Sequence, residues 1–230
     1  MLEVSALSAY YGQARALAEV NLRVEQGEVV TLAGRNGAGK TTLLRCVMGL
    51  HPAVSGRVRF AGGDVSPLPA HQRARRGLGL VPDDRGIFAG LSVEEHLTLP
   101  PVVSASPWTL ARVYETFPAL EQRRRSPASK LSGGEQQMLA LARVLRMGAR
   151  MLLCDEPTEG LAPIVVSQIA DILRAVKDEG GTVLLVEQNL HFARTVADRH
   201  YLLSQGRVAA ELTNAEMGAR EHELLEHLGL

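Results

Sequence analysis

The chain has 230 residues, enough for one large domain with a hydrophobic core or for one core that carries an inserted subdomain. Lys+Arg and Asp+Glu number 25 each, and a protein that coats nucleic acid normally has a basic excess instead. No apolar run approaches the ~18–20 residues that a membrane-spanning helix requires. The N-terminus has no signal-peptide pattern. We therefore expect a cytoplasmic protein that reaches a membrane only through a partner.

Strands and helices are expected to alternate along the first third of the chain. A glycine-rich turn precedes an apolar-periodic helix over 41–50. Pro82 is expected to end the last strand of this part. The strands predicted from apolar or alternating runs are 2–12, 20–33, 57–60 and 79–81.

Residues 85–148 lack any strand signal and predict a helical insertion. Ser92 and Glu95 form a capping-box pattern that opens the first helix. Ser106-Pro107 is expected to start a second helix, with proline in its first position. A third helix is predicted over about 134–147.

The last third returns to alternating elements, which predicts an α/β fold with a mostly parallel sheet. Gln205-Gly206 is the expected turn of a hairpin. The predicted elements are a strand over 151–154, a helix over 163–179, a strand over 182–187, hairpin strands over 201–203 and 207–210, and a helical tail over 214–228.

A phosphate-binding loop is predicted at 34–41, where GRNGAGKT matches the pattern G-x-x-x-x-G-K-[ST] between a strand and a helix. The alternative, a glycine-rich turn with a chance lysine, explains this context poorly. Lys40 is placed to reach the β- and γ-phosphates, and the Thr41 hydroxyl to bind Mg²⁺. Arg35 is expected to point to solvent. The predicted nucleotide contacts of this loop are Asn36, Gly37, Ala38, Gly39, Lys40, Thr41 and Thr42.

Two carboxylates follow the apolar strand 151–154. We expect Asp155 to hold Mg²⁺ through water and Glu156 to polarise the attacking water. A strand that merely enters a solvated turn would look similar. The phosphate loop earlier in the chain favours the catalytic interpretation.

A second anion site is predicted at 131–137, LSGGEQQ. Ser132 and Glu135 form a capping box, while Gly133-Gly134 allows close backbone approach. A helix N-terminus of this kind can receive a γ-phosphate. We therefore expect Ser132, Gly133, Gly134 and Gln136 to contact nucleotide, although an ordinary capped helix has the same pattern.

The LSGGEQ segment closely resembles the signature of ABC ATPases, and the resemblance covers essentially the whole chain. It is strongest toward the ATPases of branched-chain amino-acid importers, the LivF-like branch. In ABC ATPases the signature of one subunit caps the ATP held by the phosphate loop of the other. The segments that carry the branch-level resemblance are 10–12, 37–43, 81–85, 87–88, 91–95, 117–118, 132–140, 155–163 and 185–189.

The resemblance implies a P-loop NTPase core of the RecA-like type with an antiparallel β portion and an inserted helical subdomain. The whole chain, 1–230, is then a single ABC ATPase domain. Within it, 1–84 and 149–230 form the nucleotide-binding α/β core, and 85–148 is the helical subdomain with the signature.

The resemblance also assigns roles to individual residues. Tyr11 matches the aromatic residue that stacks on adenine, the alternative being a core tyrosine. Asp83 replaces a glutamine that bridges Mg²⁺ and the insertion, and Gln188 replaces a switch histidine. Gln188 can hydrogen-bond a phosphate or water but cannot shuttle a proton. Ala162 stands where an aspartate is usual.

The function implied is that of an ATP-hydrolysing subunit, with ATP and Mg²⁺, that powers import of branched-chain or other amino acids. A urea or short-amide importer, a soluble ABC ATPase acting on DNA or ribosomes, and a P-loop kinase are the alternatives. The implied partners are transmembrane permease subunits, a second ATPase that is identical or different, and indirectly an external solute-binding protein, but no nucleic acid.

Two surface features remain open at this point. Arg73, Arg75 and Arg76 form a basic cluster that is expected on a solvated face, the alternative being contact with a permease or with lipid headgroups. Phe88, beside Leu91 and Val93, belongs either to the core of the insertion or to a groove that receives a permease helix.

Overall fold

The computed structural model describes residues 1–52 and 55–219, and none of the helices in these ranges is long and apolar enough to cross a membrane. In chain order the elements are β1 (Leu2–Tyr11), β2 (Ala14–Val24), β3 (Val29–Ala33), α1 (Lys40–Met48), β4 (Ser55–Phe60), β5 (Gly63–Asp64), α2 (Ala70–Arg75), β6 (Leu78–Val81), α3 (Val93–Thr98), α4 (Leu110–Thr116), α5 (Pro118–Gln122), a 3₁₀ helix (Ala128–Lys130), α6 (Gly133–Met147), β7 (Met151–Asp155), α7 (Pro163–Asp178), β8 (Thr182–Glu187), α8 (Leu190–Val196), β9 (Arg199–Ser204) and β10 (Arg207–Thr213).

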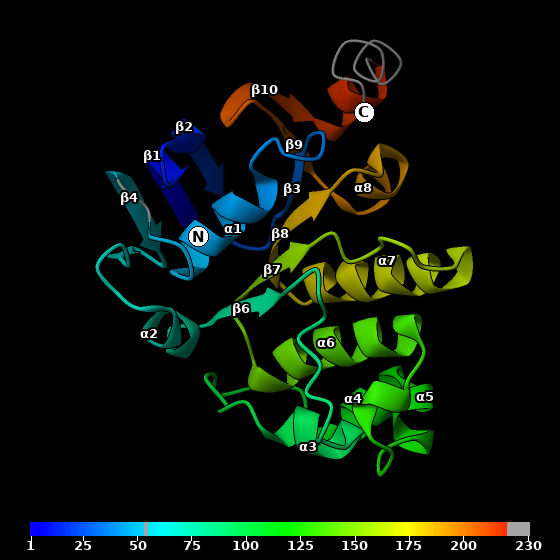
Figure 1. The fold of residues 1–230 in the computed structure, drawn as a ribbon. Helices are drawn as coiled ribbons and strands as arrows, with labels where there is room; N and C mark the ends of the chain where they lie inside the picture. The colour runs from blue at the N-terminus through cyan, green and yellow to red at the C-terminus, as the bar shows by residue number, and fades with distance from the viewer. Residues whose placement is uncertain (53–54, 220–230) are drawn as a thin grey trace.

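The strands form two sheets (Figure 1). One is antiparallel, in the order β2-β1-β4-β5, and the other has the order β10-β9-β3-β8-β7-β6. Strands β9, β3, β8, β7 and β6 of the larger sheet pair in parallel, and β10 adds an antiparallel edge. The parallel pairing of β3, β8 and β7 brings their carboxyl ends together at one edge, where ligands bind in open α/β sheets.

Helix α1 lies in the apolar cluster that joins the two sheets. Its buried residues Leu43, Leu44 and Val47 share that cluster with Val4 of β1 and Leu32 of β3. The phosphate loop at the start of α1 is therefore held between two rigid layers.

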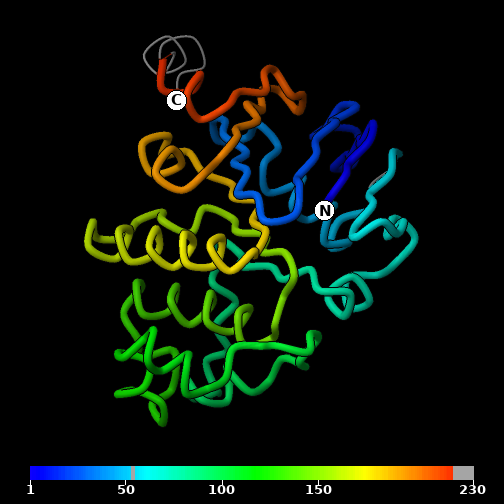
Figure 2. Tube along the Cα trace, turned by 180° about the vertical axis from the view of Figure 1, so that it is seen from behind, coloured from blue at the N-terminus to red at the C-terminus, as the bar shows by residue number. Residues whose placement is uncertain are grey.

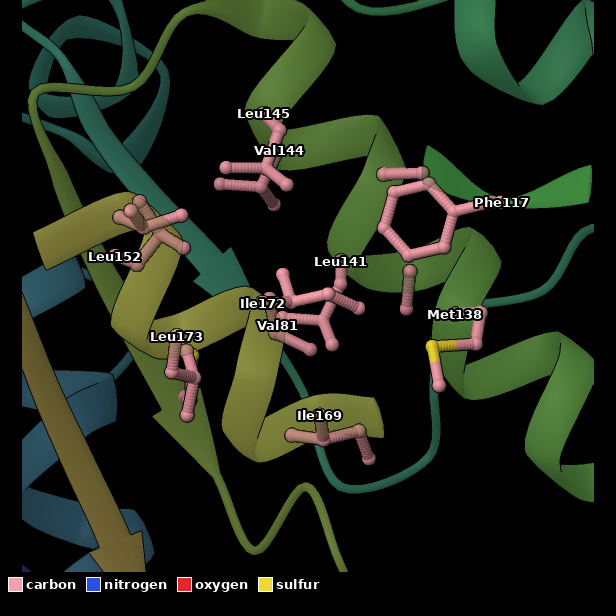
Figure 3. Close-up of a cluster of buried hydrophobic side chains, with 14 of the residues drawn as sticks. Val81, Phe117, Met138, Leu141, Val144, Leu145, Leu152, Ile169, Ile172 and Leu173 are labelled. Carbon is pink, nitrogen blue, oxygen red and sulfur yellow. The ribbon is translucent and has the colours of Figure 1, made fainter. Parts of the chain in front are cut away.

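The opposite face of the larger sheet carries α6 and α7 (Figure 3). Leu141 of α6 and Ile172 of α7 pack with Val81 of β6 and Leu152 of β7. Neighbouring residues of β7 belong to different apolar clusters. Leu152 packs with α6 and α7, whereas Leu153 belongs to the cluster that contains α1. The helices α3 to α6 all lie between β6 and β7 in the chain and gather at one end of the molecule (Figure 2). The division into an α/β core and an inserted subdomain at 85–148 stays a prediction, because one apolar cluster includes residues from both.

Several predicted boundaries were wrong. The strand expected over 20–33 is two strands in different sheets, broken by a turn at Gly27, whose φ is +75°. The helix expected at Ser106-Pro107 begins at Leu110, because the Thr109 side chain caps it by accepting a hydrogen bond from the Arg112 N–H. Helices α2 and α8 were not predicted.

Other predictions were confirmed. Capping boxes are present at Ser92, with Glu95, and at Ser132, with Glu135. Of the tail predicted as a helix over 214–228, residues 214–219 are helical and the remainder lies outside the described residues.

Arg73 is buried, so its expected place on a solvated face was wrong. Its guanidinium donates hydrogen bonds of 2.8 Å to the carbonyl oxygens of Cys46 and Val47 at the end of α1, and also to Ser66 and Leu68. Arg73 therefore ties α2 to the last turn of the helix that begins at the phosphate loop, while Arg75 on the same helix is exposed.

Replacing Arg73 with methionine should lower the free energy of unfolding by ~3 kcal/mol or more, because two buried and two part-buried carbonyl oxygens lose a charged donor. Urea denaturation measures this change. The matched control is Arg75→Met, for which we expect a change within about 0.5 kcal/mol. Equal effects of the two substitutions would show that the Arg73 hydrogen bonds do not stabilise the fold.

Candidate functional site

The phosphate loop leaves β3 at Gly34 and ends at Gly39, just before α1. Gly39 has a φ of +106°, and a Cβ there would lie 2.8 Å from the carbonyl oxygen of Ala16, so only glycine fits. No side chain caps the N-terminus of α1, and its first turn contains no acidic residue. The backbone N–H groups there are free of side-chain acceptors and can bind an anion.

Lys40 is buried inside this loop. Its ammonium donates to the carbonyl oxygens of Gly34 at 2.7 Å and Arg35 at 3.1 Å, and it forms an ion pair with Glu156 Oε1 at 3.1 Å. These contacts close the loop around the lysine. The Arg35 side chain is exposed, as expected.

Oxygen ligands gather where α1 meets the end of β7. The Thr41 hydroxyl donates to Asp155 Oδ1 at 3.1 Å. The pKa of Asp155 is raised to about 6, mainly by burial and also by the nearby Asp83 and Glu156 carboxylates, while the Thr41 hydrogen bond and the charge of Arg45 oppose the rise. Within the described residues Asp155 has no ion-pair partner, so a bound cation would relieve its desolvation.

Glu156 and Gln188 meet at the same edge. The Gln188 amide donates to Glu156 Oε2 at 2.7 Å and to the side-chain oxygen of Asn36 at 2.8 Å. Glu156 has a φ of +45°, a left-handed conformation that is rare outside glycine and is found at functional sites. The predicted catalytic residues Lys40, Glu156 and Gln188 are thus joined in one network with Asn36.

The signature segment lies elsewhere. Ser132 caps α6, and a Cβ on Gly134 would lie 3.0 Å from Val165 of α7. Gln136 accepts a hydrogen bond from the Arg85 guanidinium at 3.3 Å. Because α6 and α1 pack on opposite faces of the larger sheet, one chain does not unite the two predicted nucleotide-binding segments. Across residues 1–52 and 55–219, no hydrogen bond or ion pair links 131–137 to 34–42.

The remaining predicted residues surround this edge. Tyr11 is 50% exposed and contacts the His51 ring with centroids 4.4 Å apart, so it is not a core tyrosine. Asp83 is exposed just beyond β6, which pairs with β7. Thr42 and Ala38 are buried in the loop and first turn. Ala162 precedes α7 and gives it no side-chain cap.

Two residues at this edge had no predicted role. Glu187 ends β8 and is buried, and Thr158 donates a hydrogen bond of 2.7 Å to its carboxyl group. The signal in the sequence is that Glu187 closes an apolar strand just as Asp155 does, directly before Gln188.

Comparison with known proteins agrees with this arrangement. The family model described as ABC transporter matches residues 17–159. The chain belongs to the ABC transporter family. It therefore binds nucleotide and hydrolyses ATP, as the motifs predicted, and ATPases of this family dimerise and work with transmembrane permease subunits.

Curated relatives match along nearly the full length. The chain is 42% identical to the high-affinity branched-chain amino acid transport ATP-binding protein BraG of Pseudomonas aeruginosa, covering 94% of each chain. It is 38% identical to the probable branched-chain amino acid transport ATP-binding protein LivF of Archaeoglobus fulgidus, over 99% of this chain and 98% of the other. The lipopolysaccharide export ATP-binding protein LptB of Escherichia coli is 37% identical, over 96% and 93%.

Solved structures support the predicted α/β P-loop fold. An ATP-binding subunit of an ABC transporter has a TM-score of 0.82 at 27% identity, covering 99% of this chain and 95% of the other. A dimeric ATP-binding cassette bound to ADP and Pi has a TM-score of 0.84 at 24% identity, covering 93% and 99%. At that identity the second likeness shows the fold alone.

Lys40→Ala should weaken ATP binding by about 30-fold or more, corresponding to ~2 kcal/mol for a lost charged hydrogen bond in a poorly hydrated loop. Isothermal titration with ATP·Mg²⁺ measures the affinity, and thermal unfolding verifies that the variant folds. Unchanged affinity in a folded variant would show that Lys40 does not contribute to phosphate binding.

Proposed function

We propose that this chain is the ATPase subunit of an importer for branched-chain or other small amino acids. The observation that carries the proposal is the likeness to two branched-chain amino acid transport ATP-binding proteins over at least 94% of this chain. Gln188 stands where ABC ATPases usually have histidine, and its amide donates hydrogen bonds to both Glu156 and Asn36.

The residues at the edge fit a magnesium ion. The Thr41 hydroxyl and the buried Asp155 carboxylate supply adjacent oxygen atoms, and Asp83 lies close enough to influence the Asp155 pKa. Mg²⁺ prefers a few protein oxygens, with water and phosphate completing its shell. No cluster of three or more metal-ligating side chains occurs among the described residues, which agrees with an ion held largely by substrate and water. When bound, Mg²⁺ would neutralise charge on the phosphates.

The Lys40–Glu156 ion pair explains how the site responds to substrate. Lys40 is the cation expected at the γ-phosphate, yet here it is paired with Glu156. A phosphate that takes over the ammonium frees the Glu156 carboxylate to accept a hydrogen bond from water. Gln188 keeps that carboxylate oriented through its 2.7 Å hydrogen bond. Hydrolysis then depends on positioning and electrostatics within a rigid edge.

The opposite-face placement of α1 and α6 supports a composite site made by two ATPase subunits. Ser132, Gly133 and Gly134 of one subunit would meet a γ-phosphate held by Lys40 of the other. The second subunit is either another copy of this chain or a related ATPase. We place the dimer on the cytoplasmic face of the membrane, attached through permease subunits, with an external solute-binding protein delivering the amino acid.

Lipopolysaccharide export is the second candidate, because the likeness to LptB is also close and covers 96% of this chain. Purification of the tagged chain from its native membrane, with identification of the co-purifying proteins, separates the candidates. Permeases that transport labelled leucine or valine after reconstitution would support the proposal. Permeases that extract lipopolysaccharide, or that carry urea, would overturn it.

Glu156→Gln should leave ATP bound but reduce turnover by ~10²–10⁴-fold, the range for loss of a general base. Affinity should hold or rise, because Lys40 loses its competing partner and a negative charge leaves the site. Steady-state phosphate release and gel filtration with ATP·Mg²⁺ measure turnover and the persistence of the dimer.

Two variants calibrate this result. Gln188→Ala should reduce turnover less, because Gln188 only positions groups, and Asp83→Gln should retain or raise activity. Near-normal turnover in Glu156→Gln would show that another group handles the water, with Asp83 as the first candidate.

Phe88→Glu should release the chain from its permease while sparing ATP binding. Phe88 is 53% exposed and Leu91 is half-buried, whereas Val93 is fully buried, so Phe88 offers a partner the most apolar surface of the three. A charge buried in such a contact costs ~2 kcal/mol or more, about 30-fold in affinity. Co-purification and ATP titration test this together. Leu50→Glu, at a similarly exposed residue just after the C-cap of α1, should retain both. Loss of ATP binding in Phe88→Glu would favour the alternative that Phe88 belongs to the core of the insertion.

A further inference from the structure

Glu187 is a buried carboxyl group directly before Gln188, one of the two residues expected to handle water. It is the last residue of β8 and is 3% exposed. Its Oε1 accepts hydrogen bonds from the Thr158 hydroxyl at 2.7 Å and the Thr158 N–H at 3.3 Å. Its Oε2 accepts from the Asn189 N–H at 3.4 Å. One side chain therefore binds the loop that follows β7 and the loop that follows β8.

Those two loops carry Glu156 and Gln188. Thr158 lies two residues after Glu156, and Gln188 stands between Glu187 and Asn189. The loops also meet through the Glu156 N–H, which donates to the Val186 carbonyl oxygen at 3.0 Å. The left-handed backbone at Glu156 needs support from its surroundings, because a non-glycine residue there is strained.

Stability alone explains Glu187 poorly. Burial raises its pKa to about 7, and no cation pairs with it within the described parts of the chain. A buried carboxyl group is costly unless its oxygens are well satisfied. Its two oxygens match donors on two separate loops, an arrangement that a smaller or apolar side chain cannot reproduce.

We propose that Glu187 is a positioning residue for ATP hydrolysis, whose carboxyl group holds the Glu156 and Gln188 loops in register. The inference rests on the proposed roles of Glu156 and Gln188. In this role Glu187 need not contact nucleotide or water. It acts through Thr158 and Asn189, which fix the backbone on either side of the Gln188–Glu156 hydrogen bond.

The test measures kcat and KM for ATP in the complex that co-purifies with the tagged chain. Glu187→Ala should lower kcat about tenfold, because small displacements of reacting groups are costly, with KM within about twofold. Glu187→Gln keeps an oxygen for Thr158 but loses the acceptor for the Asn189 N–H, so its kcat should lie between the native value and that of Glu187→Ala. Thr158→Val should resemble Glu187→Ala, and the double variant should lose no more than either alone.

The matched control is Thr182→Val at the other end of β8. Thr182 is also fully buried, and its hydroxyl accepts one hydrogen bond, from the Gly27 N–H at 3.0 Å. It should lower the melting temperature and leave kcat unchanged. If kcat fell merely because the fold is less stable, it would fall in Thr182→Val as well as in Thr158→Val.

Three results would overturn the proposal: unchanged kcat in Glu187→Ala, additive losses in the double variant, or kcat that follows melting temperature across all variants. Glu156→Gln serves as the reference. If it retains turnover, the proposed site itself is wrong. If it loses turnover while the Glu187 variants do not, only the positioning role fails.

Discussion

The buried ammonium group of Lys40 is the interaction on which the site depends. A cation buried at 4% exposure must be surrounded by acceptors, and the carbonyl oxygens of Gly34 and Arg35 with the Glu156 carboxylate provide them. These acceptors surround the Lys40 ammonium only if the end of β3, the start of α1 and the end of β7 lie close together. The parallel pairing of β3, β8 and β7 produces that convergence.

The same sheet separates the two segments that are predicted to contact nucleotide. Its strands are buried on both sides, so one face packs α1 and the other packs α6 and α7. In the proposed composite site neither the phosphate loop nor the signature completes a nucleotide site within one chain. Two ATPase subunits would then be needed for each site, which agrees with the dimers that ATPases of this family form.

The sequence predicted the local features well, because each depends on neighbouring residues. The phosphate loop at 34–41 and the capping box of Ser132 and Glu135 follow from spacing alone. The strand over 20–33 failed because hydrophobicity does not tell which sheet a strand joins. Arg73 was misplaced because two of its four carbonyl acceptors, those of Cys46 and Val47, come from a distant segment of the chain. Glu187 was missed for the same reason, since Thr158 lies 29 residues away.

The central claim is that two ATPase subunits share each nucleotide site. The most direct measurement is the structure of the purified Glu156→Gln complex with ATP·Mg²⁺. The account predicts Ser132 and Gly134 of this chain against the γ-phosphate held by the partner ATPase, with Lys40 of this chain on its own ATP. A nucleotide bound by the phosphate loop and signature of one chain, or a complex with a single ATPase subunit, would contradict it.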